Sequence, residues 1–214
     1  MKQQSPAVLI EIADSIAILR FNRPAERNPL SRKTLLELNT LLNELKINQN
    51  IKAIIFTGSE DVFLSGANIR ELAELNPSSA LAFSHLGQQL FQTIADAEPI
   101  TIAAVNGYCM GGGLDLALAC DIRLASQTAV FSHPGTKLGI ITGWGGTQRL
   151  PRLVGTANAL EFFATAGRYS STKALEIGLV SLISDPVLDA AIQLVQTIGT
   201  EKRRRAANPA PQGS

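Results

Sequence analysis

The chain carries at residues 104–126 the sequence AVNGYCMGGGLDLALACDIRLAS. Its first two residues are the end of a continuously apolar run, Ile100 to Val105. Such a run is typical of a strand buried on both faces. Asn106-Gly107 ends this strand, and three consecutive glycines then precede the residues of a helix. Glycine lets a backbone approach a ligand closely, and the first turn of a helix leaves N–H groups free at its positive end. The stretch therefore predicts a strand-to-helix turn that presents hydrogen-bond donors.

A second stretch, FLSGANI at residues 63–69, also places a glycine where a buried strand ends. Two N–H groups aimed at one oxygen form an oxyanion hole, and removing one donor from such a hole costs about 3 kcal/mol of transition-state stabilisation. The structural alternative is a pair of tight strand-to-helix turns with no ligand, because a triple glycine alone is a weak signal.

The N-terminal half predicts alternating strands and helices. Residues 8–21 alternate between apolar and polar on both sides of Asp14-Ser15, which indicates a β-hairpin. Ser31 is placed to cap a helix with a leucine stripe, and Ala53 to Thr57 is another continuously apolar strand.

A long amphipathic helix over residues 81–94 separates the two buried strands. The order strand, helix, strand predicts parallel pairing, so the expected fold class is α/β in one domain with a parallel-sheet core. From Ala157 onward the pattern is helical.

Composition restricts the function class. The 214 residues are 45% hydrophobic, and nineteen basic residues nearly balance eighteen acidic ones. This balance argues against binding to nucleic acids or membranes through bulk charge and favours a small-molecule partner. Cys109 and Cys120 match neither a CxxC pair nor a disulfide framework and are interpreted as buried thiols. The polar Met1 to Pro6 segment resembles no signal peptide, so we expect a cytoplasmic location.

Several common sites are absent from the sequence. The glycines at 107 and 111–113 do not form G-x-G-x-x-G, and neither a P-loop nor a G-x-S-x-G elbow occurs. With only His85 and His133 available, the sequence predicts no metal site.

Four ordered blocks resemble the signatures of the crotonase (enoyl-CoA hydratase/isomerase) superfamily. They are FNRP at 21–24, FLSGANIRE at 63–71, the stretch at 104–126, and LGIITGWGGTQRLPRLVG at 138–155. The resemblance implies a spiral of ββα turns, an acyl-CoA thioester as ligand, and no cofactor beyond the coenzyme A of the substrate. It also implies a homo-oligomer, either a trimer or a hexamer.

The resemblance assigns roles to individual residues. The backbone N–H groups of Ala67 and Gly112 would hold the thioester carbonyl, and Trp144 would shape the acyl pocket, unless it serves only in packing. The residues implied along the bound acyl-CoA are Arg27, Ser65, Gly66, Asn68, Ile69, Gly111, Gly135 and Trp144.

The chain departs from the two glutamates that resembling hydratases use. Asp115 stands at the first position and Gly135 at the second, within FSHPG at 131–135. Adding water across a double bond needs a base and an acid, each worth about 10²- to 10⁴-fold. We therefore expect efficient hydration to be impaired. His133 is a candidate for the missing group if its ring turns inward.

Three interpretations remain open. The first is a hydratase or isomerase, a lyase or isomerase by reaction class, that acts on a fatty or short-chain acyl-CoA through Asp115. The second is decarboxylation of a malonyl-type thioester, in which Gly135 leaves room for a substrate carboxylate. The third is a non-catalytic acyl-CoA-binding protein, in which Asp115 only caps a helix.

The C-terminal end is expected to be shorter than in the family, whose members continue with helices that cover the site and build a trimer. We predict a crotonase-like domain over residues 1–205 and a disordered tail over 206–214. The basic cluster Lys202 to Arg205 is interpreted as a solvated helix end.

Overall fold

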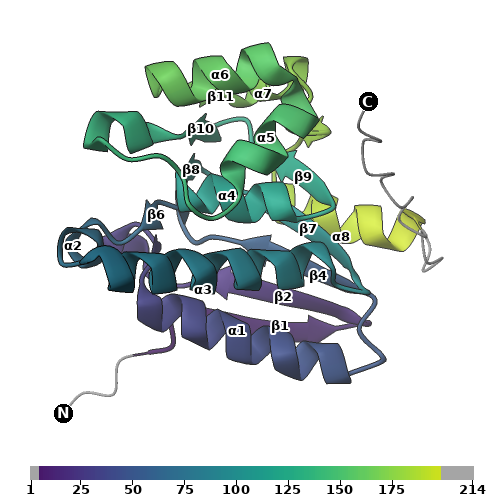
Figure 1. Cartoon of the computed structure of the whole chain (residues 1–214). Coiled ribbons are helices and arrows are strands. Elements are labelled where there is room, and N and C mark those ends of the chain that lie inside the picture. Colours follow the sequence, from purple (N-terminus) through teal and green to yellow (C-terminus); the bar gives the residue numbers. More distant parts are fainter. Residues whose placement is uncertain (1–4, 199–214) are drawn as a thin grey trace, which may run out of the picture.

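The computed structural model describes residues 5–198, which fold around one large sheet (Figure 1). The sheet has six strands in the order β1-β2-β4-β7-β9-β12. Their bounds are Val8–Ala13 (β1), Ile16–Phe21 (β2), Ala53–Thr57 (β4), Ile100–Val105 (β7), Ile122–Ala125 (β9) and Leu182–Ile183 (β12). β1 and β2 form the predicted hairpin, and β4 and β7 pair in parallel as predicted.

Alternation along the strands builds a separate core on each face of this sheet. The helices that cover the two faces are α1 (Arg32–Ile47), α3 (Pro77–Ala95) and α8 (Val187–Ile198). Along β4, Ile54 and Phe56 belong to the core shared with α1 and α3, whereas Ala53 and Ile55 belong to the core shared with α8. Ser31 caps α1 as predicted, because its side chain accepts a hydrogen bond from the Thr34 N–H.

A second sheet has the order β11-β10-β8-β5, and β3 pairs with β6 in a third. The bounds are Pro29–Leu30 (β3), Val62–Leu64 (β5), Gly66–Ala67 (β6), Tyr108–Met110 (β8), Val130–Ser132 (β10) and Tyr169–Ser170 (β11). The chain places β4, β7 and β9 in the large sheet and the strand that follows each of them, β5, β8 and β10, in the second sheet. Helical segments follow each pair, which confirms the predicted spiral of ββα turns.

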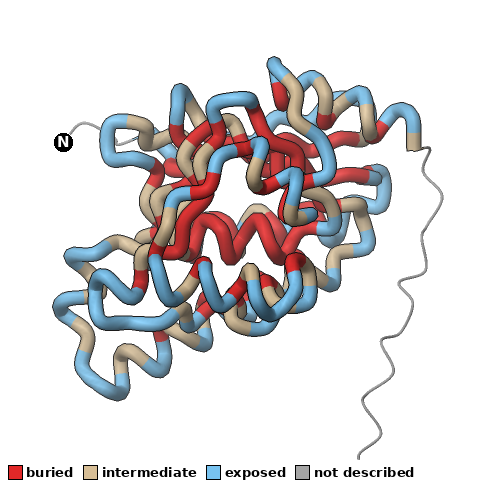
Figure 2. The backbone as a smooth tube through the Cα atoms, turned by 90° about the horizontal axis from the view of Figure 1, so that it is seen from above, coloured by how far each residue is buried: buried red, intermediate tan, exposed pale blue. Residues whose placement is uncertain are grey.

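Helix α4 (Gly112–Ala119) is buried at every residue and lies between the other layers. Figure 2 shows the buried segments gathered at the middle of the molecule and the exposed ones around them. The remaining helices are α2 (Ile69–Ala73), α5 (Gly146–Val154), α6 (Thr156–Thr165) and α7 (Ser171–Glu176), with 3₁₀ turns at Pro24–Glu26 and Pro134–Leu138. Because every residue of α4 is buried, the helix packs against the other layers along its whole length.

The prediction of continuous helix after Ala157 is wrong in part. Strands β11 and β12 interrupt the helices there, and two residues are too few to reveal a period in the sequence. The predicted tail and the Lys202 to Arg205 cluster lie outside the described residues. Within residues 5–198, none of the helices combines the length and the apolar character needed to cross a bilayer.

Candidate active site

The two glycine-containing turns meet in space. Gly66 has a φ of +94°, and a β-carbon there would lie 2.8 Å from the Met110 carbonyl oxygen and 3.0 Å from the Gly112 nitrogen. A β-carbon on Gly112 would lie 3.5 Å from the Ala67 nitrogen. Only glycine lets the two backbones approach this closely, so the structure brings Ala67 and Gly112, the two predicted donors, side by side.

The start of α4 favours a bound negative charge. Gly112 is the first residue of the helix, so its N–H has no acceptor within the helix. The preceding Gly111 has a φ of +51° and offers no side-chain cap. The positive end of the helix dipole adds to the same effect. An oxygen that becomes negative during a reaction would therefore be stabilised here.

Trp144 fixes the position of this turn. The indole is only 5% exposed, and β-carbons on Gly87 and Gly112 would lie 2.3 Å and 2.4 Å from its ring atoms. Its Nε1–H donates to the Phe83 carbonyl oxygen at 3.2 Å, and the Phe83 and Phe91 rings pack against it. The indole is thus wedged between α3 and α4, and these contacts correspond to the packing role. Its part in the acyl pocket stays a prediction.

Asp115 lies in the first turn of α4 and is 1% exposed. Its carboxylate faces away from the helix backbone: Oδ1 lies 3.3 Å from His133 Nε2, and Oδ2 accepts a hydrogen bond from the Thr142 hydroxyl. No side-chain bond caps α4. The alternative that Asp115 serves only as a helix cap is therefore wrong.

His133 turns inward, the condition that the sequence left open. The residue is 5% exposed, and its ring packs edge-on against Phe163 with 5.2 Å between the ring centroids.

Gly146 lies against the Asp115 carboxylate, because a β-carbon there would lie 2.1 Å from Asp115 Oδ1. Any side chain at position 146 would displace the carboxylate.

Thr142 is a site residue that sequence reasoning missed. It lies in the 139–144 stretch, which the sequence shows to contain no carboxylate, yet its hydroxyl contacts Asp115 directly. The signal available was the hydroxyl itself, the only polar side chain between Gly139 and Trp144.

Gly135 does not leave open space. A β-carbon there would lie 2.8 Å from the Ile140 carbonyl oxygen, and the Ile140 N–H donates to the Gly135 carbonyl oxygen at 3.0 Å. The loop between the 3₁₀ turn at Pro134–Leu138 and α5 therefore folds back over this position. The prediction that Gly135 makes room for a substrate carboxylate loses its structural basis.

The residues predicted along the coenzyme fall into two groups. The Arg27 guanidinium stacks over the Tyr108 ring at 5.3 Å, and the Ser65 N–H donates to the Arg27 carbonyl oxygen at 3.1 Å. Asn68 caps α2 by accepting from the Arg70 N–H, and the neighbouring Ile69 is 63% exposed. Arg27 and Ser65 are thus joined, whereas the half-buried Asn68 and the exposed Ile69 follow Ala67 at the start of α2.

The Asp115 carboxylate influences groups around it. Burial lowers the pKa of the Arg149 guanidinium, and Asp115 acts against that change. Burial raises the pKa of the Cys109 thiol well above its usual value, and the charge of Asp115 raises it further. Burial also raises the pKa of Cys120.

Both thiols are therefore expected to resist an aromatic disulfide reagent in the native protein at mildly alkaline pH, because the reactive thiolate is disfavoured and covered. The same reagent should titrate both thiols quickly in denaturant, which serves as the control. A native thiol that reacts as fast as free cysteine would contradict the buried placement. Absorbance of the released reagent anion measures the rate.

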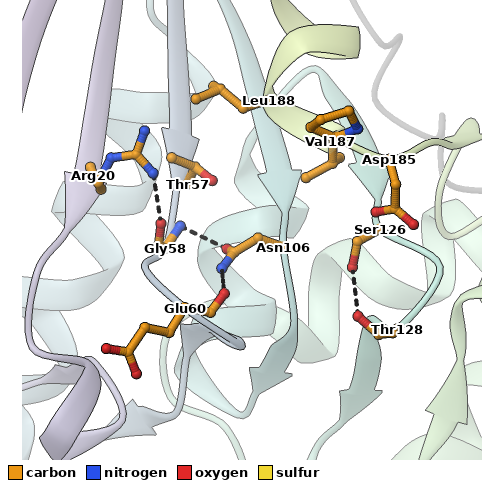
Figure 3. Close-up of a pocket in the computed structure, with 11 residues that line it drawn as sticks. Arg20, Thr57, Gly58, Glu60, Asn106, Ser126, Thr128, Asp185, Val187 and Leu188 are labelled. Atoms are coloured by element: carbon orange, nitrogen blue, oxygen red, sulfur yellow. Dashed lines mark hydrogen bonds between the residues drawn. The ribbon is translucent and has the colours of Figure 1, made fainter.

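A cavity of about 250 Å³ lies elsewhere, at the carboxyl ends of β2, β4 and β7 beside the start of α8 (Figure 3). Its polar groups are largely bonded to one another. Asn106 accepts from the Gly58 N–H and donates to the Glu60 carbonyl oxygen, and Arg20 donates to the Gly58 carbonyl oxygen. The cavity shares no residue with the Asp115 site. Among the described residues, no group of three or more His, Cys, Asp or Glu side chains could hold a metal ion.

Comparison with known proteins gives consistent matches. Residues 11–208 match the enoyl-CoA hydratase/isomerase family. The chain is 40% identical over 180 residues to the short-chain-enoyl-CoA hydratase of Clostridium acetobutylicum and to the crotonyl-CoA hydratase of Syntrophomonas wolfei, covering 84% of this chain and 69% of each relative. The crystal structure of an enoyl-CoA hydratase from Bacillus anthracis superposes with a TM-score of 0.86 at 33% identity, over 90% of this chain and 76% of that one.

Proposed function

We propose that this chain, which belongs to the enoyl-CoA hydratase/isomerase family, binds an acyl-CoA thioester and stabilises the enolate formed from it. The observation that carries the proposal is the contact between the turns of Ala67 and Gly112, with Asp115 one helical turn further along α4. The two N–H groups are suited to hold the thioester oxygen as it becomes negative. The buried Asp115 carboxylate and its partner His133 supply an acid/base pair that could move a proton of the bound acyl chain.

The reaction that fits best is proton transfer within an enoyl-CoA, as in an isomerase. An isomerisation needs one acid/base centre and the oxyanion hole, and the Asp115–His133 pair offers such a centre. Hydration needs a second group beside the water, and Gly135 supplies none. Hydration is the second candidate, because two of the relatives are named as hydratases.

The wider predictions belong to the same proposal. The coenzyme A of the substrate is the only coenzyme required, and Arg27, Ser65, Asn68 and Ile69 are proposed to contact it. A cytoplasmic location and a trimer or hexamer remain predictions. Size-exclusion chromatography with light scattering tests the oligomeric state.

The test of function is incubation with crotonyl-CoA, 3-enoyl-CoA and methylmalonyl-CoA in D₂O, followed by mass spectrometry. Deuterium uptake without addition of water identifies an isomerase, and a mass gain of one D₂O identifies a hydratase. Loss of CO₂ from methylmalonyl-CoA would instead favour decarboxylation. Binding of all three thioesters without any change in mass would contradict catalysis and leave a binding protein.

A further inference from the structure

The direction of the hydrogen bonds around Asp115 decides which atom of the buried Asp115–His133 pair is free to accept a proton. The Thr142 hydroxyl oxygen accepts from the Trp144 N–H at 3.4 Å, so its own hydrogen is available to Asp115 Oδ2. The hydrogen bonds therefore run in one direction, from the Trp144 N–H to the Thr142 hydroxyl and from that hydroxyl to the Asp115 carboxylate. An ionised carboxylate only accepts hydrogen bonds. Asp115 Oδ1 therefore requires a donor on its other side.

That donor is His133 Nε2, which lies 3.3 Å from Oδ1. A neutral imidazole with hydrogen on Nε2 has its lone pair on Nδ1. Among the residues that the structure describes, no group hydrogen-bonds His133 Nδ1. This nitrogen would lie 3.7 Å from a β-carbon on Gly135, beside the position that lacks the second carboxylate and that the Ile140 carbonyl oxygen approaches. The free acceptor of the pair is thus on the histidine.

His133 is also tied to the turn that carries the oxyanion donor. The Gly111 N–H donates to the Ser132 carbonyl oxygen at 2.9 Å, and a β-carbon on Gly111 would lie 3.9 Å from Pro134 Cδ. The residues on both sides of His133 therefore contact the start of α4. His133 is therefore tied through its neighbours to the turn that is proposed to hold the thioester oxygen.

From this geometry we infer that His133 Nδ1 is the base that exchanges protons with the acyl chain, and that Asp115 and Thr142 are positioning residues. The inference rests on the proposed acyl-CoA function. His133 Nδ1 takes a proton from the acyl carbon chain, and the electrons of the broken C–H bond form the enolate, whose oxygen is held by the Ala67 and Gly112 N–H groups. The imidazolium, stabilised by Asp115, returns a proton to the carbon chain and regenerates the enzyme.

The tautomer of His133 in the free protein is the first test, and it needs no substrate. The chain has only two histidines, so their ¹⁵N resonances are easily assigned, and the exposed His85 is the internal control. We expect His133 to carry its hydrogen on Nε2 and to lose this preference in Asp115→Asn, while His85 is unchanged. Hydrogen on Nδ1 in the wild-type protein would overturn the inference.

Chemical rescue is the second test. His133→Ala is expected to lower deuterium exchange into the acyl chain about 10²- to 10⁴-fold, and added imidazole should restore part of the rate. His85→Ala is the matched control and should exchange at the wild-type rate. Exchange by His133→Ala close to the wild-type rate would overturn the inference and leave Asp115 as the base. No exchange by the wild-type protein would instead sink the proposed function.

Substitution of Thr142 tests whether its hydroxyl positions the Asp115 carboxylate. Thr142→Val removes the hydroxyl but keeps the shape, so Asp115 loses one of its two anchors. We expect kcat to fall about 10- to 10²-fold with KM little changed, since a small displacement of a reacting group costs this much. Thr142→Ser should restore most of the rate. Equal rates for Thr142→Val and the wild-type protein would show that the hydroxyl does not position the pair.

Discussion

Asp115→Asn is expected to lower the rate of proton exchange at the acyl chain about 10³- to 10⁴-fold while acyl-CoA binding changes little. The amide has nearly the same volume as the carboxylate, so the buried space stays filled. It presents an N–H group where Oδ1 or Oδ2 now accepts from His133 and Thr142. The histidine is then held in the wrong tautomer, and an imidazolium has no negative partner. Deuterium uptake into crotonyl-CoA, followed by mass spectrometry, measures the rate.

Asp61→Asn is the matched control, because it removes the same charge from an exposed residue. It should exchange protons at the wild-type rate. Circular dichroism of both variants tests whether they remain folded. A fully active Asp115→Asn protein would show that the buried pair takes no part in proton transfer.

Gly113→Ala is expected to destabilise the protein by about 3 kcal/mol, near the upper end of the cost of overpacking. A β-carbon there would lie 2.5 Å from Leu64 Cβ and 2.6 Å from the Leu64 carbonyl oxygen. Strand β5, which contains Leu64, leads directly into β6, so pushing α4 away from it also separates Ala67 from Gly112. Urea denaturation measures the loss of unfolding free energy.

Helix propensity makes the opposite prediction for this change. Alanine is favoured over glycine inside a helix by about 1 kcal/mol, and Gly113 is not among the glycines with positive φ. The control is Gly178→Ala, where no atom lies within 4 Å of the new β-carbon but φ is +76°, so only backbone strain of about 1–2 kcal/mol is expected. A Gly113→Ala protein more stable than the wild type would contradict the close packing of α4 on β5.

The sequence predicts well what depends on local periodicity. The alternation in residues 8–21 is that of the hairpin β1–β2, and the apolar runs at 53–57 and 100–105 are the central strands, because strands buried on both faces need continuous apolar residues. The glycine turns could also be located. Their contact in space followed only from the resemblance, since Gly112 lies 45 positions after Ala67 in the sequence.

The sequence could not predict contacts that depend on how a loop folds back. The Trp144 ring packs against Gly87 of α3 and Gly112 of α4, which are far apart in the sequence. Thr142 reaches Asp115 only because the loop over residues 139–145 returns over α4. Gly135 illustrates the same limit. Its missing side chain suggests an empty space, but a carbonyl group from Ile140 lies there.

The most direct measurement of the central claim uses acetoacetyl-CoA, whose α-hydrogen is acidic and whose enolate has its own ultraviolet band. An oxyanion hole formed by Ala67 and Gly112 binds the enolate more tightly than the keto form, so adding the protein should raise the enolate band in a saturable titration at constant pH. The account predicts this rise, and with it a higher affinity for acetoacetyl-CoA than for butyryl-CoA. Saturable binding of both thioesters with equal affinity and no enolate band would contradict enolate stabilisation at this site.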